Sequence, residues 1–127
     1  LPKWLPGTVR VPWEFGLLEK LLPIMEPAFD SCEVDYGIRS KINWMHPKDG
    51  QTIAELHTKR SDGADLIVYA PAGKVTVGSI VSIGSMQEIE PHKGQRDQIR
   101  IRFTAEAQTA VKPLSEFLAT IRKLNEA

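Results

Sequence analysis

The sequence predicts an α+β fold, in which an antiparallel sheet of about five strands has N- and C-terminal helices packed on one face. Two observations carry this prediction. Apolar residues recur at helical spacing near both ends of the chain, and short strand-like segments separated by turn residues fill the middle. With 127 residues, 42% of them hydrophobic, the chain has the size and composition of one ordinary globular domain.

The first helix is predicted to follow a proline-rich N-terminal arm. Residues 1–12 form an extended entry arm in this interpretation, and residues 13–127 form a single α+β domain. Pro12 suits the first turn of a helix because the N–H that it lacks has no helical partner there. Pro23, in contrast, is expected to kink or end the helix. The apolar stripe that indicates this helix comprises Leu17, Leu18, Leu21, Leu22 and Met25.

Five segments in the middle of the chain have the pattern of β-strands. Cys32, Val34 and Tyr36 alternate with acidic residues, which is typical of a half-buried strand. Turn residues separate the first four segments, which favours an antiparallel meander. Residues 75–84 fit either a strand or one face of a short helix. The expected strands span residues 32–36, 41–45, 52–58, 66–70 and 98–104.

The last strand and the C-terminal helix have the clearest patterns. Ile99, Ile101 and Phe103 alternate with polar residues and therefore point to one face of the sheet. Arg100 and Arg102 must share the opposite face, where we expect them to lie exposed and side by side. The helix predicted after Pro113 has an apolar stripe formed by Leu114, Phe117, Leu118, Ile121 and Leu124.

Charge, cysteine content and hydropathy restrict the classes of function. Sixteen basic residues balance sixteen acidic ones, which argues against a dedicated polyanion-binding protein. The single cysteine, Cys32, indicates a reducing compartment, so we expect a cytoplasmic location. No apolar run reaches the roughly 20 residues that a membrane helix needs. The start at Leu1 resembles neither a signal peptide nor a native start, so we expect a domain excised from a longer protein.

Residues that could bind a metal or act as a nucleophile are few and scattered. Cys32 begins an apolar strand face, where a small buried hydrophobe is a commoner role than a thiol nucleophile. Ala72-Gly73-Lys74 lacks the flanking residues of a phosphate loop. We therefore expect no enzyme activity, no cofactor and no metal in this domain. The residues that could ligate a metal, none at the close spacing of a zinc site, are Cys32, His46, His57 and His92.

A group of basic residues is the strongest indication of a binding surface. Some of them lie on or near the last strand, and Trp44 and Tyr36 could place aromatic rings beside them. Cations with aromatic rings on an open sheet face are typical of single-stranded nucleic-acid binding. The alternative is a solvated sheet face in which arginines and lysines pair with carboxylates. The candidate DNA-contact residues are Lys59, Arg60, Arg96, Arg100 and Arg102.

Several short segments together resemble a known family. They are Pro6-Gly7-Thr8-Val9 with Trp13 and Leu17-Leu18-Glu19; Thr58-Lys59-Arg60 with Asp62-Gly63 and Leu66-Ile67-Val68; Gly73-Lys74 with Val77-Gly78-Ser79-Ile80 and Ile83-Gly84; Ile99-Arg100-Ile101-Arg102-Phe103; and Leu114-Ser115-Glu116-Phe117-Leu118. This set resembles a small accessory domain appended to some UvrA-like proteins of the ABC excinuclease, of the planctomycete type.

The resemblance implies a parent protein more than a mechanism. UvrA-like proteins are the ATP-driven DNA-damage sensors of nucleotide excision repair. Their ATP sites use Walker motifs and ABC signatures and their zinc sites use paired cysteines, and this sequence has none of these motifs. The resemblance therefore implies a non-catalytic accessory domain that contributes contacts with the rest of the parent polypeptide or weak contacts with DNA.

Two other hypotheses remain open at this stage. The chain could be a structural or protein-interaction module without a nucleic-acid role. It could also be an enzyme or a small-molecule-binding α+β domain. A contiguous face of arginine and lysine would favour the DNA-repair hypothesis, whereas a deep apolar cleft lined by Trp44, Tyr36 and a histidine would favour small-molecule binding.

Overall fold

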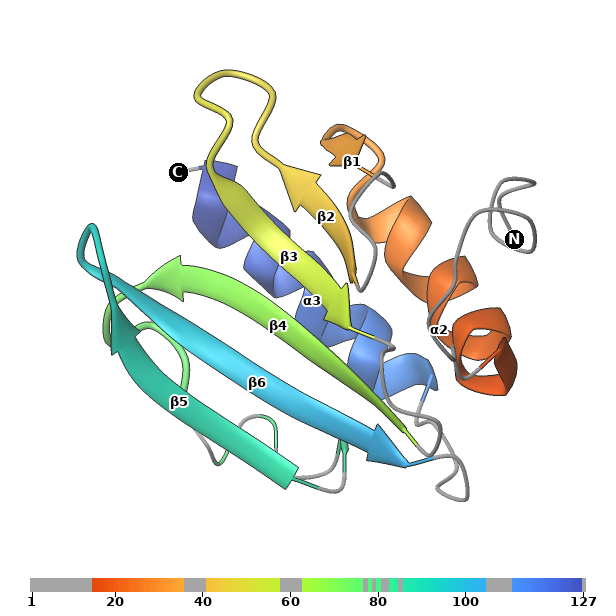
Figure 1. The fold of residues 1–127 in the computed structure, drawn as a ribbon. Coiled ribbons are helices and arrows are strands. Elements are labelled where there is room, and N and C mark those ends of the chain that lie inside the picture. Colours follow the sequence, from red (N-terminus) through yellow and green to blue (C-terminus); the bar gives the residue numbers. More distant parts are fainter. Residues whose placement is uncertain are drawn as a thin grey trace.

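The computed structural model describes residues 15–35, 41–57, 63–76, 78, 80, 83, 84, 86–104 and 111–126. These residues form two layers, an antiparallel sheet and a pair of helices that cover one of its faces (Figure 1). The elements are helix α2 (Phe15–Ala28), strands β1 (Glu33–Asp35), β2 (Lys41–Met45), β3 (Thr52–His57), β4 (Gly63–Pro71), β5 (Met86–His92) and β6 (Arg96–Thr104), and helix α3 (Val111–Glu126).

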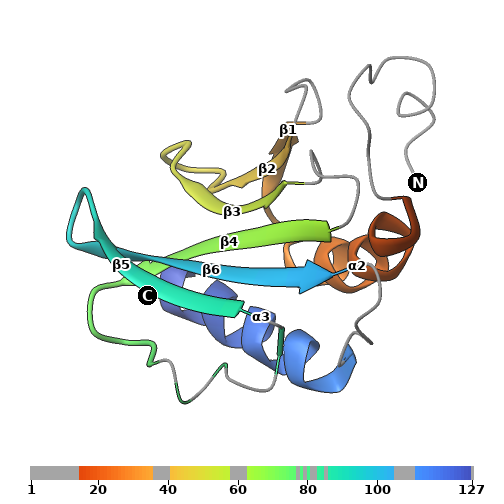
Figure 2. The ribbon, with the colours of Figure 1, turned by 60° about the horizontal axis from the view of Figure 1, so that its bottom comes forward.

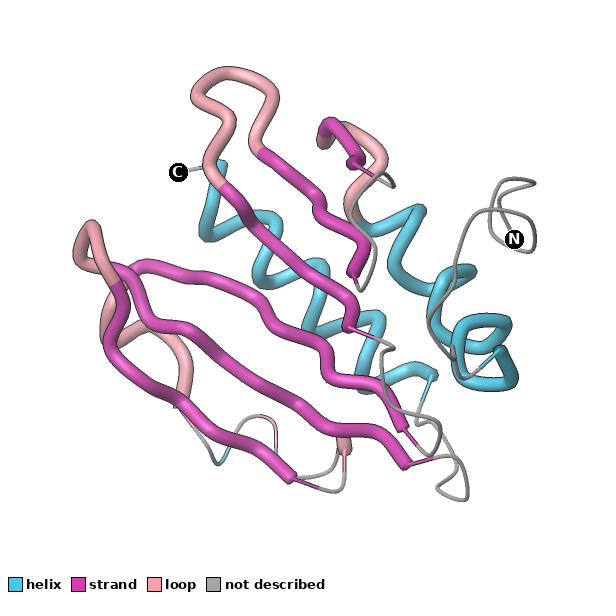
Figure 3. Tube along the Cα trace, viewed as in Figure 1, coloured by secondary structure: helices cyan, strands magenta, loops and turns pink. Residues whose placement is uncertain are grey.

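The predicted α+β fold is confirmed, with six strands in place of about five. The strand order is β1-β2-β3-β4-β6-β5, and every pair is antiparallel. The first four strands form the predicted meander. Strand β6 then pairs with β4, and β5 forms the edge beyond it (Figure 3). Strand β5 is the additional strand, because the segment that contains Glu88 and Glu90 pairs with β6 along its whole length.

The hydrophobic core lies between the sheet and the two helices (Figure 2). Of the stripe predicted on α3, Leu114, Phe117, Leu118 and Ile121 are buried, and Leu124 is partly buried against the core. The ring of Phe29, just after α2, packs against that of Trp44 with centroids 6.1 Å apart. Trp44 is therefore a core residue, and the expectation that it lies beside the basic residues is wrong.

Of the two outcomes expected at Pro23, an end of the helix does not occur, because α2 continues through both Pro23 and Pro27 to Ala28. The segment 75–84, which fits a strand or a short helix, lies partly outside the described residues, since positions 77, 79, 81 and 82 are not described. Among its described residues, Ile80 and Ile83 are buried in the core.

The loop that follows β4 packs closely against β6 at Gly84. A side-chain carbon at this position would lie 2.7 Å from the carbonyl oxygen of Arg102. Only glycine fits such a close approach of two backbones. The same loop therefore both fills one end of the core and abuts the last strand.

Some predictions fall outside the described residues: the 1–12 arm, Tyr36, Lys59 and Arg60. Neither of the described helices has the length and apolar character that a membrane crossing would require.

Candidate functional site

Helices α2 and α3 cover one face of the sheet and leave the other uncovered, which we call the open face (Figure 2). Polar side chains of β3, β4 and β6 gather on it. The register determines which side chains meet there. Arg102 of β6 lies directly opposite Asp65 of β4, which in turn lies opposite His57 of β3. Because directly opposed residues share one face, these three side chains form a row across the sheet.

Asp65 is the centre of the first charge cluster on the open face. Its carboxylate accepts hydrogen bonds from Arg102, at 2.8 Å for Nε to Oδ1 and 3.3 Å for Nη2 to Oδ2. Nη1 of Arg100 lies 3.5 Å from Oδ2 of the same residue. Only 8% of Asp65 is exposed. One buried carboxylate is therefore paired with the guanidinium groups of both arginines.

Glu55, on β3, is the centre of the second cluster. Nζ of Lys41 lies 2.7 Å from its Oε1, and Nε2 of His57 lies 3.3 Å from its Oε2. The hydroxyl of Tyr69 donates to Oε2 at 3.4 Å. Burial by itself would raise the pKa of Glu55, but the hydrogen bonds from His57 and Lys41 and the Lys41 charge outweigh it and lower the pKa to about 2. Glu55 is therefore a fixed anion near neutral pH.

Tyr69 connects this cluster to Arg96 and His92. The guanidinium of Arg96 lies over the Tyr69 ring, 4.7 Å from its centroid, while its Nη1 donates to the carbonyl of Thr52 at 2.7 Å. The His92 ring lies 4.9 Å from the Tyr69 ring. Burial, followed by the nearby Glu55 charge, raises the pKa of Tyr69 and keeps its hydroxyl protonated. Arg96 thus spans from β6 to the start of β3 and covers an aromatic ring.

Three of the five predicted DNA-contact residues lie within the described part of the chain, and the fold places Arg96, Arg100 and Arg102 on one face. Their expected exposure is only partial. The side chains of Arg100 and Arg102 are 37% and 23% exposed, and both face Asp65. Whether these arginines contact DNA stays a prediction.

Sequence reasoning missed the two carboxylates that organise the open face. Glu55 stands between Ala54 and Leu56, and an acidic residue between two apolar ones is a period-two signal of a polar face. Asp65 was missed because the fourth strand was expected to begin at Leu66, whereas β4 begins at Gly63. Their meeting with the cations depends on strand register, which the pattern of one strand alone does not give.

Cys32 and His46 both line one hollow of ≈ 280 Å³, which Arg122 also lines. Burial raises the pKa of the Cys32 thiol, and Asp30 and Glu126 add to this effect while Arg122 opposes it. The Nδ1 atom of His46 accepts a hydrogen bond from the Lys48 backbone at 3.1 Å. A thiol with a raised pKa is the opposite of an activated nucleophile.

The three histidines contact different groups. His46 belongs to the β2–β3 turn, His57 to the Glu55 cluster and His92 to the Tyr69 cluster. Among the residues that the structure describes, no three histidine, cysteine or acidic side chains are grouped in a way that could hold a metal ion.

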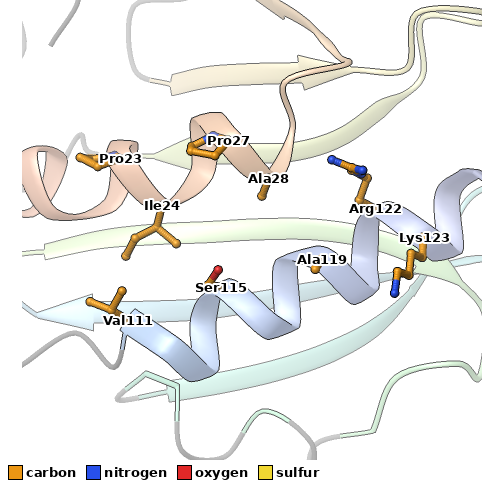
Figure 4. Close-up of a pocket in the computed structure, with 9 residues that line it drawn as sticks. All are labelled: Pro23, Ile24, Pro27, Ala28, Val111, Ser115, Ala119, Arg122 and Lys123. Atoms are coloured by element: carbon orange, nitrogen blue, oxygen red, sulfur yellow. The ribbon is translucent and has the colours of Figure 1, made fainter.

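A separate groove lies between α2 and α3, on the side of the helices that faces away from the sheet (Figure 4). It has a volume of ≈ 370 Å³. Its lining residues are Pro23, Ile24, Pro27 and Ala28 of α2, and Val111, Ser115, Ala119, Arg122 and Lys123 of α3.

Comparison with known proteins gave no relative. No protein-family model, no curated protein and no solved structure matches the chain.

Proposed function

We propose that the chain is a non-catalytic accessory domain of a UvrA-like DNA-repair ATPase, and that it acts in nucleotide excision repair mainly through contacts with other protein. The pairing of charges on the open face is the observation that favours contacts with protein over contacts with DNA. Arg100 and Arg102 share the buried carboxylate of Asp65, and Lys41 is bound to Glu55. Cations already paired with buried carboxylates attract a polyanion weakly.

The energetic argument follows from what DNA would have to replace. A phosphate that approached Arg102 would compete with a carboxylate already bound at 2.8 Å. It would also approach Asp65 and the exposed acidic side chains of Glu88 and Glu90 on the neighbouring edge strand. Because Asp65 is buried, it cannot move away and regain its hydration. The open face is therefore better suited to supporting the sheet than to binding a nucleic-acid backbone.

Weak DNA contact is a second candidate, favoured by one side chain. Arg100 is more exposed than Arg102, and its ion pair with Asp65 is the longer of the two at 3.5 Å. It could therefore turn toward a phosphate at little cost. A few such contacts would give sequence-independent binding of about micromolar affinity or weaker at low salt.

The non-catalytic part of the proposal is supported by the state of the reactive groups. The acidic side chains of Glu55 and Asp65 are bound by cations, and the Cys32 thiol has a raised pKa. Trp44, which a small-molecule cleft would need on its wall, is fully buried in the core. None of these three described groups is therefore an activated nucleophile or a poised general acid.

The complete reading frame that encodes these residues tests the proposed parent. We expect it to contain Walker motifs and an ABC signature outside the 127 residues, and the purified full-length product to hydrolyse ATP. Deletion of the present domain should leave that hydrolysis measurable. A complete frame without ATPase motifs would contradict the proposed parent.

A further inference from the structure

We propose that the groove between α2 and α3 is the docking site for an amphipathic helix of a partner protein, which carries carboxylates in its first turn and lies antiparallel to α3. This inference rests on the proposed function in one respect, namely that the domain acts through contacts with other protein. The lining of the groove, the charge at one of its ends and the direction of α2 and α3 indicate which kind of helix would bind there.

The groove changes in character from one end to the other (Figure 4). Ile24 and Val111 face each other at one end, and Val111 is 58% exposed, the one large hydrophobic residue with such exposure in the described part of the chain. Ser115 and Ala119 line the middle, where their small side chains allow another backbone to come close. An apolar helix surface would cover this strip and remove Val111 from water.

The other end of the groove is cationic. Lys123 is exposed and has no ion pair among the described residues, and no carboxylate lines the groove. Arg122 has two ion pairs, at 3.4 Å to Asp30 and 3.3 Å to Glu126. Both of these acidic side chains are more than half exposed. Exposed pairs of this kind contribute little, so a partner carboxylate could replace one of them.

The direction of the two helices determines the direction of the partner. α2 and α3 run the same way, so their C-terminal ends lie together beside Arg122 and Lys123 (Figures 1 and 4). A helix C-terminus carries partial negative charge and a helix N-terminus carries partial positive charge. A third helix is therefore favoured with its N-terminus at this end. Acidic residues are also most stable in a first turn, where they would meet the two cations.

The length of the groove fits a short helix. Val111 and Lys123 mark its ends on α3, and a helical rise of 1.5 Å per residue makes it about 18 Å long. A partner helix of about twelve residues would span this distance.

Three synthetic peptides test the proposal by fluorescence anisotropy with the 127-residue chain. Each has about fourteen residues and the same leucine stripe at i, i+3, i+4 and i+7. The first carries three glutamates in its first turn, the second carries lysines there, and the third carries the glutamates in its last turn. We expect the first peptide to bind about fivefold or more tightly than the second and about threefold more tightly than the third.

Variants of α3 locate the binding. Ala119→Gln fills the middle of the groove without adding charge and should weaken the first peptide at least about fivefold. Lys123→Glu should abolish the preference for the acidic peptide. Lys112→Glu is the matched control, because it makes the same charge change on the same helix outside the groove, and it should change affinity less than about twofold. If Ala119→Gln does not fold, Ser115→Gln serves the same purpose.

Several outcomes would overturn the docking site. These are no saturable binding of the first peptide, equal binding of all three, or binding that is indifferent to both groove-filling variants. A concentration-dependent dimer of the wild type that Ala119→Gln abolishes would show that a second copy of the chain occupies the groove instead. None of these results depends on the reading frame, so the docking site and the proposed parent can fail separately.

Discussion

The open face of the sheet and the outer surface of the two helices differ in how their charges are partnered. On the open face, buried Asp65 and Glu55 each bind more than one basic or polar side chain. On the helices, Lys123 has no ion pair within the described residues, and Val111 exposes an apolar side chain. The contrast indicates that the open face serves stability, whereas the helix surface is available for binding.

This difference has a physical origin in the two layers. A sheet face that no helix covers still buries side chains, because long residues lie across their neighbours, as Arg96 lies over Tyr69. Buried charges must then be paired. Exposed charges on the outer side of a helix need no partner within the chain, because water solvates them. The residues there can therefore be suited to contact with a partner protein.

The largest expected effect lies on the inner side of α3. Phe117 is 7% exposed, so Phe117→Ala should cost roughly 3–5 kcal/mol of the free energy of unfolding, the usual range for a buried phenylalanine. Chemical denaturation measures this loss. Glu116→Ala, an exposed neighbour on the same helix, should stay within about 0.5 kcal/mol. A loss below about 1 kcal/mol for Phe117→Ala would show that α3 packs only loosely on the sheet.

The second effect tests whether the open face supports stability. The pKa of Glu55 is about 2 in the folded chain, against 4.5 as the ordinary value. Because the folded pKa is the lower one, the carboxylate contributes fully above pH 4.5, and this contribution is lost as the pH falls toward 2. It amounts to about 3 kcal/mol at most.

Denaturation between pH 6 and pH 2 measures this contribution, with Glu55→Gln as the comparison. The variant should be less stable near neutral pH and should lose less stability on acidification. Equal acid sensitivity of the two proteins would show that Glu55 is not one of the groups that hold the open face together.

The third effect concerns the arginines. If Asp65 is what keeps Arg100 and Arg102 from DNA, Asp65→Asn should remove the carboxylate charge that both of them face while preserving the shape of the side chain. Affinity for single- and double-stranded DNA at low salt should then rise about three- to tenfold. The dependence on salt should steepen by about −0.7 to −0.9 for each new phosphate contact.

The double variant Arg100→Glu/Arg102→Glu is the control for this titration, since it removes the cations and should remove any binding. Wild-type binding that is already tight and strongly salt-dependent would contradict the view that the face is neutralised. Unchanged binding in Asp65→Asn would show that the arginines take no part.

Much of the fold could be predicted because it depends on local periodicity. Strand β2 was predicted with its observed bounds, and the stripe of α3 is buried as expected. Local rules could not decide whether α2 would end at Pro23 or continue through it. The helix is held by buried Leu21, Leu22 and Met25, and Pro23 lies on its exposed side, so tertiary packing outweighs the cost of a lost hydrogen bond.

The candidate site was less predictable because it depends on register. The alternation in β6 placed Arg100 and Arg102 on one face correctly. That Asp65 lies opposite Arg102 follows only from the pairing of β4 with β6, two strands that are far apart in the sequence. The helix groove had no sequence signal at all, since its lining comes from two helices at opposite ends of the chain.

The smallest expected change in stability is at the groove, whose lining residues we expect to contribute little to the free energy of unfolding. Ala119 is exposed in the middle of the groove, and glutamine is compatible with a helix. Ala119→Gln should therefore change the free energy of unfolding by no more than about 0.5 kcal/mol. Ala70→Gln is the matched control. Ala70 is fully buried on β4, so the same substitution there should cost at least about 2 kcal/mol through overpacking and a buried amide. Thermal melts of both variants give the answer. A substantial loss for Ala119→Gln would mean that the groove contributes to the fold of this chain, and the helix surface would then resemble the open face in serving stability.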